Sequence, residues 1–435
     1  MPDFFPFSGV RYRPDAAAAR LEDLTAPPYD VIDAEAWARL EAAHPMNAVH
    51  LILPRDQEPG DRYQRAARRL RDWQEQGVLE ADPPRLYLYR MAFTGEGGEP
   101  RVTMGVVGAL ALSPPGQGDV LPHERTMSKP RGDRLELLRA TRANLDPVWL
   151  LSMAPGLSDL LVLGDNQAPA TVQARAGSCI DADGVEHCLV PLPDDVSARV
   201  SEIVASAPVV IADGHHRYET ALAFSEEEDA RRGVVPGGGA GAPADAAMSR
   251  QAKSHVHSIL ALVVELVPDQ LSVRPIHRLL MGAGPDLRGR LTQVATLTPA
   301  GANTPEAVRA LQARMKAEGA MGLVDSEGLA LLTLRLDVLE AELERLPAPL
   351  REVDSARLEV ALGSLGLPEE LDFHADPAVI AAEVAKGTAD AGVFLRPVSV
   401  PQIQAVADAG ERMPEKTTYF SPKPLTGMIF RLLDD

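Results

Sequence analysis

A run of five residues from Asp213 to Arg217 reads Asp-Gly-His-His-Arg and combines side chains suited to binding an anion. The guanidinium and the imidazoles of His215 and His216 donate hydrogen bonds of the kind that phosphate and carboxylate accept. Gly214 permits a sharp turn and lets another group approach the backbone closely. The carboxylate of Asp213 could orient a histidine, hold a metal ion or cap a helix. A capped helix with surface histidines is the alternative interpretation, and it requires no function.

The residues around this run predict a strand before it and a helix after it. Residues 209–211 are a short apolar run, which is typical of a buried strand. After the turn, Tyr218, Ala221, Leu222 and Phe224 recur with the spacing of one helical face. The free N–H groups at the start of such a helix point toward the turn and favour a negative charge there.

Two further segments carry more reactive side chains than a fold requires. Residues 122–134 include His123, Glu124 and several arginines, and residues 415–423 include lysine and two threonines. The first segment is not a zinc-protease His-Glu-x-x-His helix, because Met127 stands where the second histidine should be. Lysine beside two hydroxyls is a plausible site for phosphate or carboxylate.

The motifs of several enzyme classes are missing. The sequence has no Gly-x-Ser-x-Gly nucleophile elbow, no Gly-x-x-x-x-Gly-Lys-Ser/Thr phosphate loop and no protein-kinase signature set. What remains is an anion-binding turn with acids at Glu124 and Asp213 and further cations. These groups suit phosphoryl transfer, in which the protein mainly positions the reactants and neutralises charge. A carboxylate acting as general base toward a small alcohol would complete the reaction.

Helix and strand patterns along the chain predict an α+β fold. The N-terminal pattern includes strands at Val49–Leu53, Leu86–Met91 and Val102–Leu112 and helices that start at Asp33 and Asp61. Composition breaks divide the chain into four segments. They are an N-terminal α/β unit at 1–118, a core segment at 119–230, a flexible linker or loop at 231–250, and a C-terminal α/β region at 251–435.

Charge and composition exclude some classes of protein. The 435 residues include 43 basic and 62 acidic side chains, which gives a net charge of −19. Such acidity opposes nucleic-acid binding unless a strong basic patch overcomes it, so we expect no nucleic-acid partner. Cys179 and Cys188 are too few for a secreted disulfide framework. No run reaches the roughly 18 apolar residues of a spanning helix, and no signal peptide is visible, so we expect a cytoplasmic protein without a membrane partner.

The polar segments resemble a known superfamily. The run at 213–217 is similar to the Gly-x-x-Arg loop of the ParB/sulfiredoxin superfamily, and its Asp-Gly-His-His-Arg form, with Pro122-His123-Glu124 before it, resembles the free serine kinase branch. Those kinases carry Ser-Pro-Lys-Thr-Thr near the C-terminus, where this chain has Lys416-Thr417-Thr418 and then Phe420-Ser421-Pro422-Lys423. Sulfiredoxins carry a reactive cysteine where this chain has His215, which argues against sulfenyl-type redox chemistry.

Over nearly its whole length the chain also resembles a large bacterial family known only as a domain of unknown function. The hallmarks are Ala26–Ile32, His123–Thr126 and Ile211–Leu222. The kinase resemblance is limited to the motifs, because residues 1–118 have no counterpart in the compact kinases. Together the resemblances imply a ParB/sulfiredoxin-like core with an additional N-terminal α/β unit and a C-terminal α/β region. They also imply that 119–230 is the catalytic core and that 251–435 completes the active site.

The kinase resemblance implies a role for each motif. Glu124 would take the proton from the serine hydroxyl, with His123 as a further catalytic residue, and Asp213 would assist the reaction or hold Mg²⁺. The residues that hold the phosphate or its donor would be Gly214, His215, His216, Arg217, Lys416, Thr417 and Thr418. From the residues alone, Arg131 and Arg134 are candidates to bind a substrate carboxylate or donor phosphate, and a solvated helix start is the alternative. These roles require the three segments to converge in space.

The predicted function is phosphate transfer to free L-serine to give O-phospho-L-serine, with Mg²⁺ as cofactor and ADP, ATP or pyrophosphate as donor. Its partners would be these small molecules, and the sequence leaves the oligomeric state open. One alternative is a metal-dependent hydrolase that uses His215, His216 and Glu219, with Asp213 as base. A second alternative is a non-enzymatic nucleotide-binding regulator.

Overall fold

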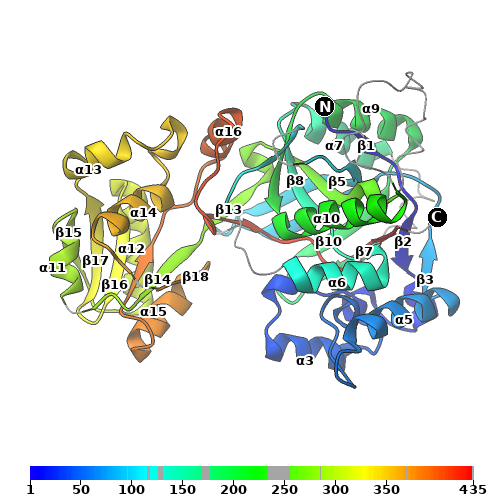
Figure 1. The fold of residues 1–435 in the computed structure, drawn as a ribbon, viewed down its shortest axis with the longest axis horizontal. Coiled ribbons are helices and arrows are strands. Elements are labelled where there is room, and N and C mark those ends of the chain that lie inside the picture. The colour runs from blue at the N-terminus through cyan, green and yellow to red at the C-terminus, as the bar shows by residue number, and fades with distance from the viewer. Residues whose placement is uncertain are drawn as a thin grey trace. The chain divides into compact units, whose positions relative to one another are not determined.

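The computed structural model describes residues 1–95, 97–114, 118–125, 131–167, 177–233, 255–284, 286–368 and 370–433. They form two compact units. Unit 1 consists of Met1–Pro122, Thr126–Gln270 and Pro422–Asp435, and unit 2 consists of His123–Arg125 and Leu271–Ser421. Both units mix helices with sheet, as the α+β prediction requires (Figure 1).

Unit 1 is built on a nine-stranded sheet in the order β6-β11-β8-β12-β5-β4-β10-β9, with β1 paired to β5. Its strands are β1 (Phe4–Phe5), β4 (Tyr87–Thr94), β5 (Pro100–Ala111), β6 (Val120–Pro122), β8 (Val148–Ser152), β9 (Gly177–Ile180), β10 (Glu186–Pro191), β11 (Val209–Asp213) and β12 (Ser258–Glu265). The predicted strands at 86–91 and 102–112 are confirmed as β4 and β5, which pair antiparallel. The sheet is mixed, because β8 runs parallel to β12 while β11 runs antiparallel to β8.

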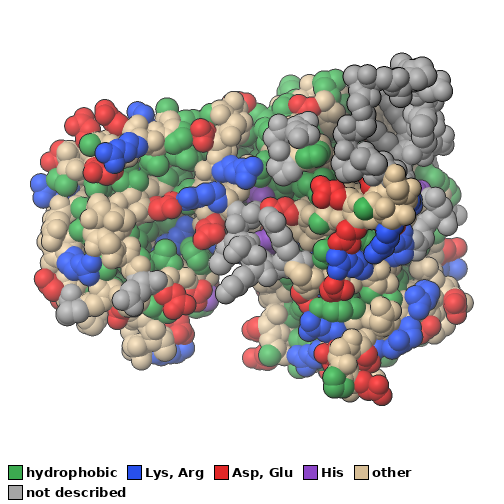
Figure 2. Space-filling view, viewed as in Figure 1, with side chains coloured by type: hydrophobic (Ala, Val, Ile, Leu, Met, Phe, Trp, Pro, Cys, Tyr) green, Lys and Arg blue, Asp and Glu red, His purple; other side chains and the backbone are tan. Residues whose placement is uncertain are grey.

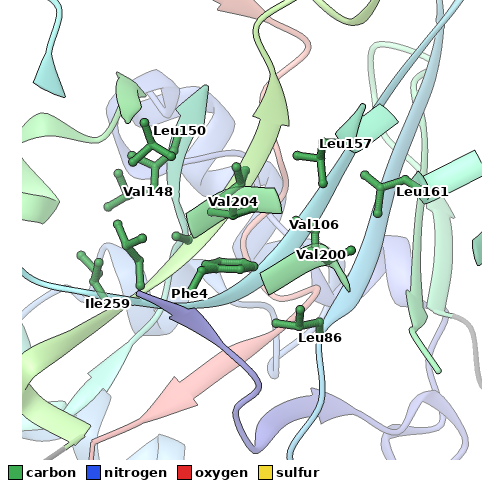
Figure 3. Close-up of a cluster of buried hydrophobic side chains, with 14 of the residues drawn as sticks. Phe4, Leu86, Val106, Val148, Leu150, Leu157, Leu161, Val200, Val204 and Ile259 are labelled. Carbon is green, nitrogen blue, oxygen red and sulfur yellow. The ribbon is translucent and has the colours of Figure 1, made fainter. Parts of the chain in front are cut away.

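The core of unit 1 gathers apolar side chains from the sheet and from helices α7 (Leu157–Gln167) and α9 (Asp194–Ala205). In Figure 3, Phe4 lies among side chains of the strands, and Val200 and Val204 of α9 lie beside it. Tyr218 and Ala221 belong to the same buried cluster. Because burying a large apolar side chain contributes about 1.5–3 kcal/mol, these contacts hold the helix after the candidate motif against the sheet.

The remaining elements of unit 1 surround this core. They are α1 (Pro14–Ala17), α2 (Leu21–Leu24), η1 (Tyr29–Val31), α3 (Ala34–Ala43), α4 (Val49–Ile52), α5 (Arg62–Glu75), α6 (Arg131–Thr141), α10 (His215–Arg231), η3 (His255–His257), η4 (Pro268–Gln270) and a small sheet of β3 (Leu79–Ala81), β2 (Gly9–Tyr12), β21 (Phe430–Leu432) and β7 (Ala143–Asn144). Figure 2 shows basic and acidic side chains interspersed over α5 and α6 on the face in view. Within the described residues, no helix is both long and apolar enough to cross a membrane.

The strand predicted at Val49–Leu53 is wrong, because residues 49–52 form helix α4. All four of these residues are buried, so the run shows neither the two-residue period of a half-exposed strand nor the 3.6-residue period of a surface helix. Asn47 favours the helical turn, since its Oδ1 accepts a hydrogen bond from the backbone N of Val49 at 2.8 Å. The helix predicted after Asp33 is confirmed, and the Asp33 side chain caps α3 by accepting from the backbone N of Ala36 at 2.7 Å.

Unit 2 contains a six-stranded sheet in the order β15-β17-β16-β19-β14-β18 and a separate pair, β13 and β20. The strands are β13 (Ser272–Pro275), β14 (His277–Met281), β15 (Ala295–Gly301), β16 (Met321–Asp325), β17 (Gly328–Leu334), β18 (Glu370–His374), β19 (Ala391–Phe394) and β20 (Thr418–Ser421). The helices are α11 (Leu287–Leu291), α12 (Pro305–Glu318), α13 (Leu336–Leu343), η5 (Ala348–Leu350), α14 (Asp354–Ser364), α15 (Pro377–Lys386) and α16 (Val400–Asp408).

Both faces of the six-stranded sheet are buried. Leu279 packs in one apolar cluster with side chains of α12 and α15, while its neighbour Leu280 packs in another with side chains of α11 and α14. Leu323 and Val324 divide between the two clusters in the same way. Successive side chains of a strand point to opposite faces, so helices cover the sheet on both sides.

The predicted segment boundaries do not coincide with the two units. β5, from the predicted N-terminal unit, pairs along its length with β12, which lies beyond the predicted linker. β8 and β11, from the predicted core, belong to the same sheet. Positions 234–250 of the predicted linker lie outside the described residues. Composition cannot reveal such pairing, because it joins residues far apart in the chain.

The close packing around Gly108 of β5 can be tested by substitution. A Cβ added at Gly108 would lie 2.4 Å from Phe4 Cζ and 2.6 Å from Leu86 Cδ2. Gly108→Ala should therefore overpack the core and lower the free energy of unfolding by about 1–3 kcal/mol. Gly132→Ala in α6 is the matched control, since no described atom lies within 4 Å of an added Cβ and alanine favours a helix. Urea denaturation measures both, and a Gly108→Ala protein as stable as the wild type would contradict this packing.

Candidate functional site

The Asp-Gly-His-His-Arg run is the turn between β11 and α10, as predicted. Gly214 is the N-cap of α10 and has a φ of +88°, which residues with a side chain rarely adopt. A Cβ there would also lie 2.9 Å from Arg217 Nε, so the guanidinium folds back against the turn. Because the N-cap is a glycine, it offers no side chain to the first N–H groups of α10. These groups and the helix dipole favour an anion at the turn.

Asp213 is held between two cations at this turn. Its Oδ1 accepts a hydrogen bond from Lys423 Nζ at 2.9 Å, and its Oδ2 accepts one from Arg217 Nη2 at 2.5 Å. Lys423 Nζ also donates to Asp30 Oδ2 at 2.7 Å, and Arg217 Nη1 donates to the carbonyl of Pro147 at 2.5 Å. The Lys423 side chain is only 9% exposed, so water screens these interactions less than it screens a surface ion pair.

The charges at the turn shift the pKa values of both groups. Burial would raise the pKa of Asp213, but the charges of Lys423 and Arg217 outweigh burial and hold that pKa well below its usual range. Burial would lower the pKa of Lys423, but the carboxylates of Asp213 and Asp30 raise it above its usual value. Asp213 is therefore ionised near neutral pH and is a poor general base, since an effective base has a pKa near the working pH. The geometry suits Asp213 to holding a cation.

Arg134 is buried in unit 1, so the alternative of a solvated helix start does not describe it. Its side chain is 8% exposed, and its Nη1 donates to the carbonyl of Ile52 at 2.7 Å. Its Nε donates to Asp133 Oδ2 at 2.9 Å, and its guanidinium carbon lies 4.4 Å from the centre of the Tyr29 ring. Arg131 is the first residue of α6, but its side chain lies outside the described part of the chain.

His123, Glu124 and Thr418 form one cluster in unit 2. Glu124 Oε1 accepts hydrogen bonds from the backbone N of Thr418 at 2.7 Å and from its hydroxyl at 2.5 Å. His123 Nε2 lies 2.7 Å from Thr418 Oγ1 and 3.2 Å from Glu124 Oε1. Both His123 and Glu124 are buried. The orientation of the Glu124 carboxylate is therefore fixed by its neighbours.

Lys416 and Thr417 differ in how they are placed. Thr417 is buried, and its hydroxyl donates to the carbonyl of Pro414 at 2.7 Å and lies 2.8 Å from Ser355 Oγ. Lys416 has an exposed side chain and a φ of +55°, and its carbonyl accepts from Arg278 Nη1 at 2.9 Å. Burial lowers the pKa of Arg278 to about 10. The unusual backbone of Lys416 persists because these contacts hold the segment in place.

The segment 415–423 is divided between the two units. Thr418 binds Glu124 in unit 2, while Lys423 binds Asp213 in unit 1. Glu124 and Asp213, the two acids predicted to act in the site, therefore each bind a residue of segment 415–423.

The two histidines of the turn begin α10. Both side chains are partly exposed. Across the described residues, no group of three His, Cys, Asp or Glu side chains could hold a metal ion. The set proposed for a hydrolase, His215, His216 and Glu219, therefore does not form such a group.

Sequence reasoning missed three residues of unit 1 that contact this site or lie beside it. Asp30 and Lys423 both lie in stretches singled out by resemblance, but nothing in the sequence shows that the two side chains meet. Asp146 is 8% exposed and accepts a hydrogen bond from the Thr426 hydroxyl. The only signal for Asp146 is an acid before a proline and a predicted strand, which is common in turns.

The ion pairs of Asp213 predict a dependence of stability on pH. A carboxyl whose pKa is lowered by folding stabilises the protein above its unfolded pKa of about 3.9, and this contribution is lost as the pH falls. The free energy of unfolding of the wild type should therefore fall more steeply between about pH 5 and pH 3 than that of Asp213→Asn. Asp183→Asn, at an exposed turn residue, should keep the wild-type slope. Urea titrations across this range measure the slopes, and equal slopes for wild type and Asp213→Asn would refute the ion-pair assignment.

Comparisons with known proteins give a family and several structural likenesses. No curated protein matches the sequence. A conserved hypothetical protein from Pyrococcus furiosus shares 14% identity with a TM-score of 0.33, and the match covers 72% of this chain and 90% of that one. A free serine kinase in complex with AMP shares 14% identity with a TM-score of 0.35, covering 72% and 88%. SbnI with a C-terminal truncation, from Staphylococcus aureus, shares 13% identity with a TM-score of 0.36, covering 71% and 82%.

The family match is the broadest of these findings. Residues 4–356 match the family described as a protein of unknown function, DUF1015. This range covers most of the 435 residues. The chain therefore belongs to the DUF1015 family.

Proposed function

We propose that this protein is a phosphotransferase with free L-serine as acceptor and O-phospho-L-serine as product. The donor would be ADP, ATP or pyrophosphate. The observation that carries the proposal is the glycine-capped start of α10, which has the cations Lys423 and Arg217 beside Asp213. A ParB/sulfiredoxin-like core, implied by the resemblance of the motifs, is part of the same proposal.

The turn can neutralise a phosphate with groups that are already in place. The N–H groups at the start of α10 would meet the phosphate oxygens, as helix starts do in other phosphate sites. The contacts with Asp213 hold Lys423 and Arg217 before any ligand binds, so binding orders few additional side chains. Preorganised donors that position a phosphate are a large part of what phosphoryl transfer requires of a protein.

Asp213 and Asp30 would hold Mg²⁺ in this proposal. Both carboxylates bind the Lys423 ammonium, so Mg²⁺ would share them with this cation. Mg²⁺ prefers oxygen ligands and commonly binds through one or two protein carboxylates together with phosphate oxygens and water. The ionised state of Asp213 keeps its oxygens suited to a metal ion. The bound ion would supply further neutralisation of phosphate charge.

Glu124 is the proposed general base for the acceptor hydroxyl. A serine hydroxyl is a weak nucleophile near neutral pH, and a positioned carboxylate that takes its proton accelerates such a reaction about 10²–10⁴-fold. The two hydrogen bonds from Thr418 fix Oε1 of Glu124 and so orient the carboxylate. His123 contacts both residues and would keep this arrangement in place.

Glu124→Gln tests the base. The amide keeps the shape of the side chain and still accepts from Thr418, but it cannot take a proton. We expect the rate of serine phosphorylation to fall about 10²–10⁴-fold, while the dissociation constant of the donor changes little. Phosphorus NMR with Mg²⁺, L-serine and ADP, ATP or pyrophosphate in turn measures the reaction and identifies the donor.

Glu359→Gln is the matched control, because this exposed glutamate of unit 2 pairs with Arg125 at the surface. It should leave turnover unchanged. Turnover close to wild type in Glu124→Gln would remove Glu124 from the mechanism. No O-phosphoserine from the wild type with any of the three donors would overturn the proposed function.

Lys423→Met tests the phosphate site. Methionine keeps the unbranched stem and removes the charge, and a hydrogen bond to a charged group contributes roughly 1.5–3 kcal/mol. We expect the dissociation constant of the donor to rise about tenfold or more, as measured by calorimetry with Mg²⁺ present. Lys386→Met, at an exposed lysine of α15, is the control and should leave the dissociation constant of the donor unchanged. Equal donor affinity in the wild type and Lys423→Met would show that Lys423 does not bind the donor and that the turn has only a structural role.

A further inference from the structure

A small cavity of about 60 Å³ in unit 1 is lined in part by Arg217 and Thr220, close to the turn in sequence. Its polar lining comes from Tyr29, Arg134, Asn144, Asp146, Arg217 and Thr220, and leucines of α6 supply part of its apolar wall. A single water needs about 10–15 Å³ measured in this way. The cavity therefore has room for several waters or for a small polar molecule.

Two hydrogen-bonding groups of the lining residues are buried and lack a partner. Arg217 Nε and Thr220 Oγ1 have no hydrogen-bond partner among the described residues. Thr220 is only 4% exposed, so bulk water does not reach its hydroxyl. Buried polar groups are nearly always hydrogen-bonded in native proteins, because leaving one unpaired is destabilising. Arg217 Nε and the Thr220 hydroxyl therefore indicate a polar occupant of the cavity that accepts hydrogen bonds.

Asp146 calls for a positively charged group in the occupant, in addition to the hydrogen-bond acceptor that Arg217 and Thr220 call for. It is 8% exposed, and among the described residues its carboxylate receives a hydrogen bond from the Thr426 hydroxyl but no ion pair within 4 Å. Burial raises the pKa of Asp146, although the charges of Arg217 and Arg134 and the Thr426 hydrogen bond oppose the rise. A buried carboxylate without a direct ion pair favours a positively charged donor beside it. A purely anionic occupant would be repelled by it.

We propose that this cavity binds the zwitterion of a small α-amino acid. The ammonium group would pair with Asp146, and the carboxylate would accept hydrogen bonds from Arg217 Nε and the Thr220 hydroxyl. This inference rests on the proposed function, because free L-serine is its acceptor, and it goes further by assigning the residues that recognise the amino-acid backbone.

The rest of the lining limits the size of the amino acid. Arg134 is fixed by the carbonyl of Ile52, by Asp133 and by the Tyr29 ring, so it forms a rigid wall instead of an adaptable ligand. Leucines 137 and 138 of α6 close another side. The volume of about 60 Å³ between these walls suits an amino acid with a short side chain.

Calorimetry without any phosphate donor tests the inference. L-Serine and L-alanine should bind to the full-length protein. Ethanolamine, which lacks the carboxylate, and 3-hydroxypropionate, which lacks the ammonium group, should each bind at least about tenfold more weakly, because each loses one charge-assisted contact. L-Lysine, with its long side chain, should not bind.

Two substitutions tie binding to the cavity. Thr220→Val removes the unpartnered hydroxyl and keeps its volume, so the melting temperature should hold or rise while the dissociation constant of L-serine rises about threefold to tenfold. Asp146→Asn still accepts from Thr426 but cannot pair with the ammonium group, and should weaken L-serine binding at least about tenfold. Thr103→Val is the matched control. Its buried hydroxyl donates to the carbonyl of Gln270 at 2.8 Å, so its loss should lower the melting temperature and leave binding unchanged.

The outcomes separate this inference from the proposed function. L-Serine binding that weakens in Thr220→Val and Asp146→Asn supports the cavity assignment even if no donor yields phosphoserine. Serine phosphorylation whose KM for serine is the same in both variants and the wild type would place the acceptor elsewhere and overturn the assignment. Failure of every amino acid to bind at millimolar concentration would show that the cavity holds only water, and would overturn it as well.

Discussion

The candidate site depends above all on the ammonium of Lys423, which is held between the carboxylates of Asp30 and Asp213. A buried charge is stable only when it is paired, because the interior does not solvate it as water does. Arg217 is the second cation on Asp213, so two positive and two negative groups balance within a few ångströms. This balance ties three distant stretches of the chain together: the η1 region, the end of β11 and the C-terminal segment. Removing one member leaves its partners uncompensated.

Arg217 shows how one side chain can serve several purposes. Its two terminal nitrogens bind Asp213 and the carbonyl of Pro147, and its Nε lies among the groups around the cavity. The residue is therefore part of the framework of the turn as well as a positive charge beside it. A guanidinium suits this position because its planar fork presents donors in several fixed directions, which an ammonium group cannot do.

The contacts around Glu124 in unit 2 are of another kind. Its carboxylate accepts hydrogen bonds from the backbone N–H and the hydroxyl of Thr418. These two hydrogen bonds orient the carboxylate. The two predicted acids therefore differ in what their surroundings favour. Asp213 accepts hydrogen bonds from Lys423 and Arg217, whereas Glu124 accepts hydrogen bonds from the backbone and hydroxyl of Thr418.

The sequence alone was enough to predict the local structure of the central motif. An apolar run, a glycine and a 3.6-residue apolar pattern specify a strand, a turn and a helix, and they form β11, Gly214 and α10. Each of these signals acts within a few residues, so it can be read without knowing the rest of the fold. The helix cap at Asp33 and the strands β4 and β5 were predicted for the same reason.

Only the tertiary structure decided which side chains meet. The helix at 49–52 is buried all round, so its sequence carries no period that could identify it. Asp30 and Lys423 lie in stretches that the sequence singled out, and Asp146 does not, but the contacts of all three are with residues far away in the chain. The pairing of β5 with β12 likewise joins segments on either side of the predicted core and linker. Local residue types determined what chemistry is available, and long-range packing determined which groups are buried together and so which charges must be paired.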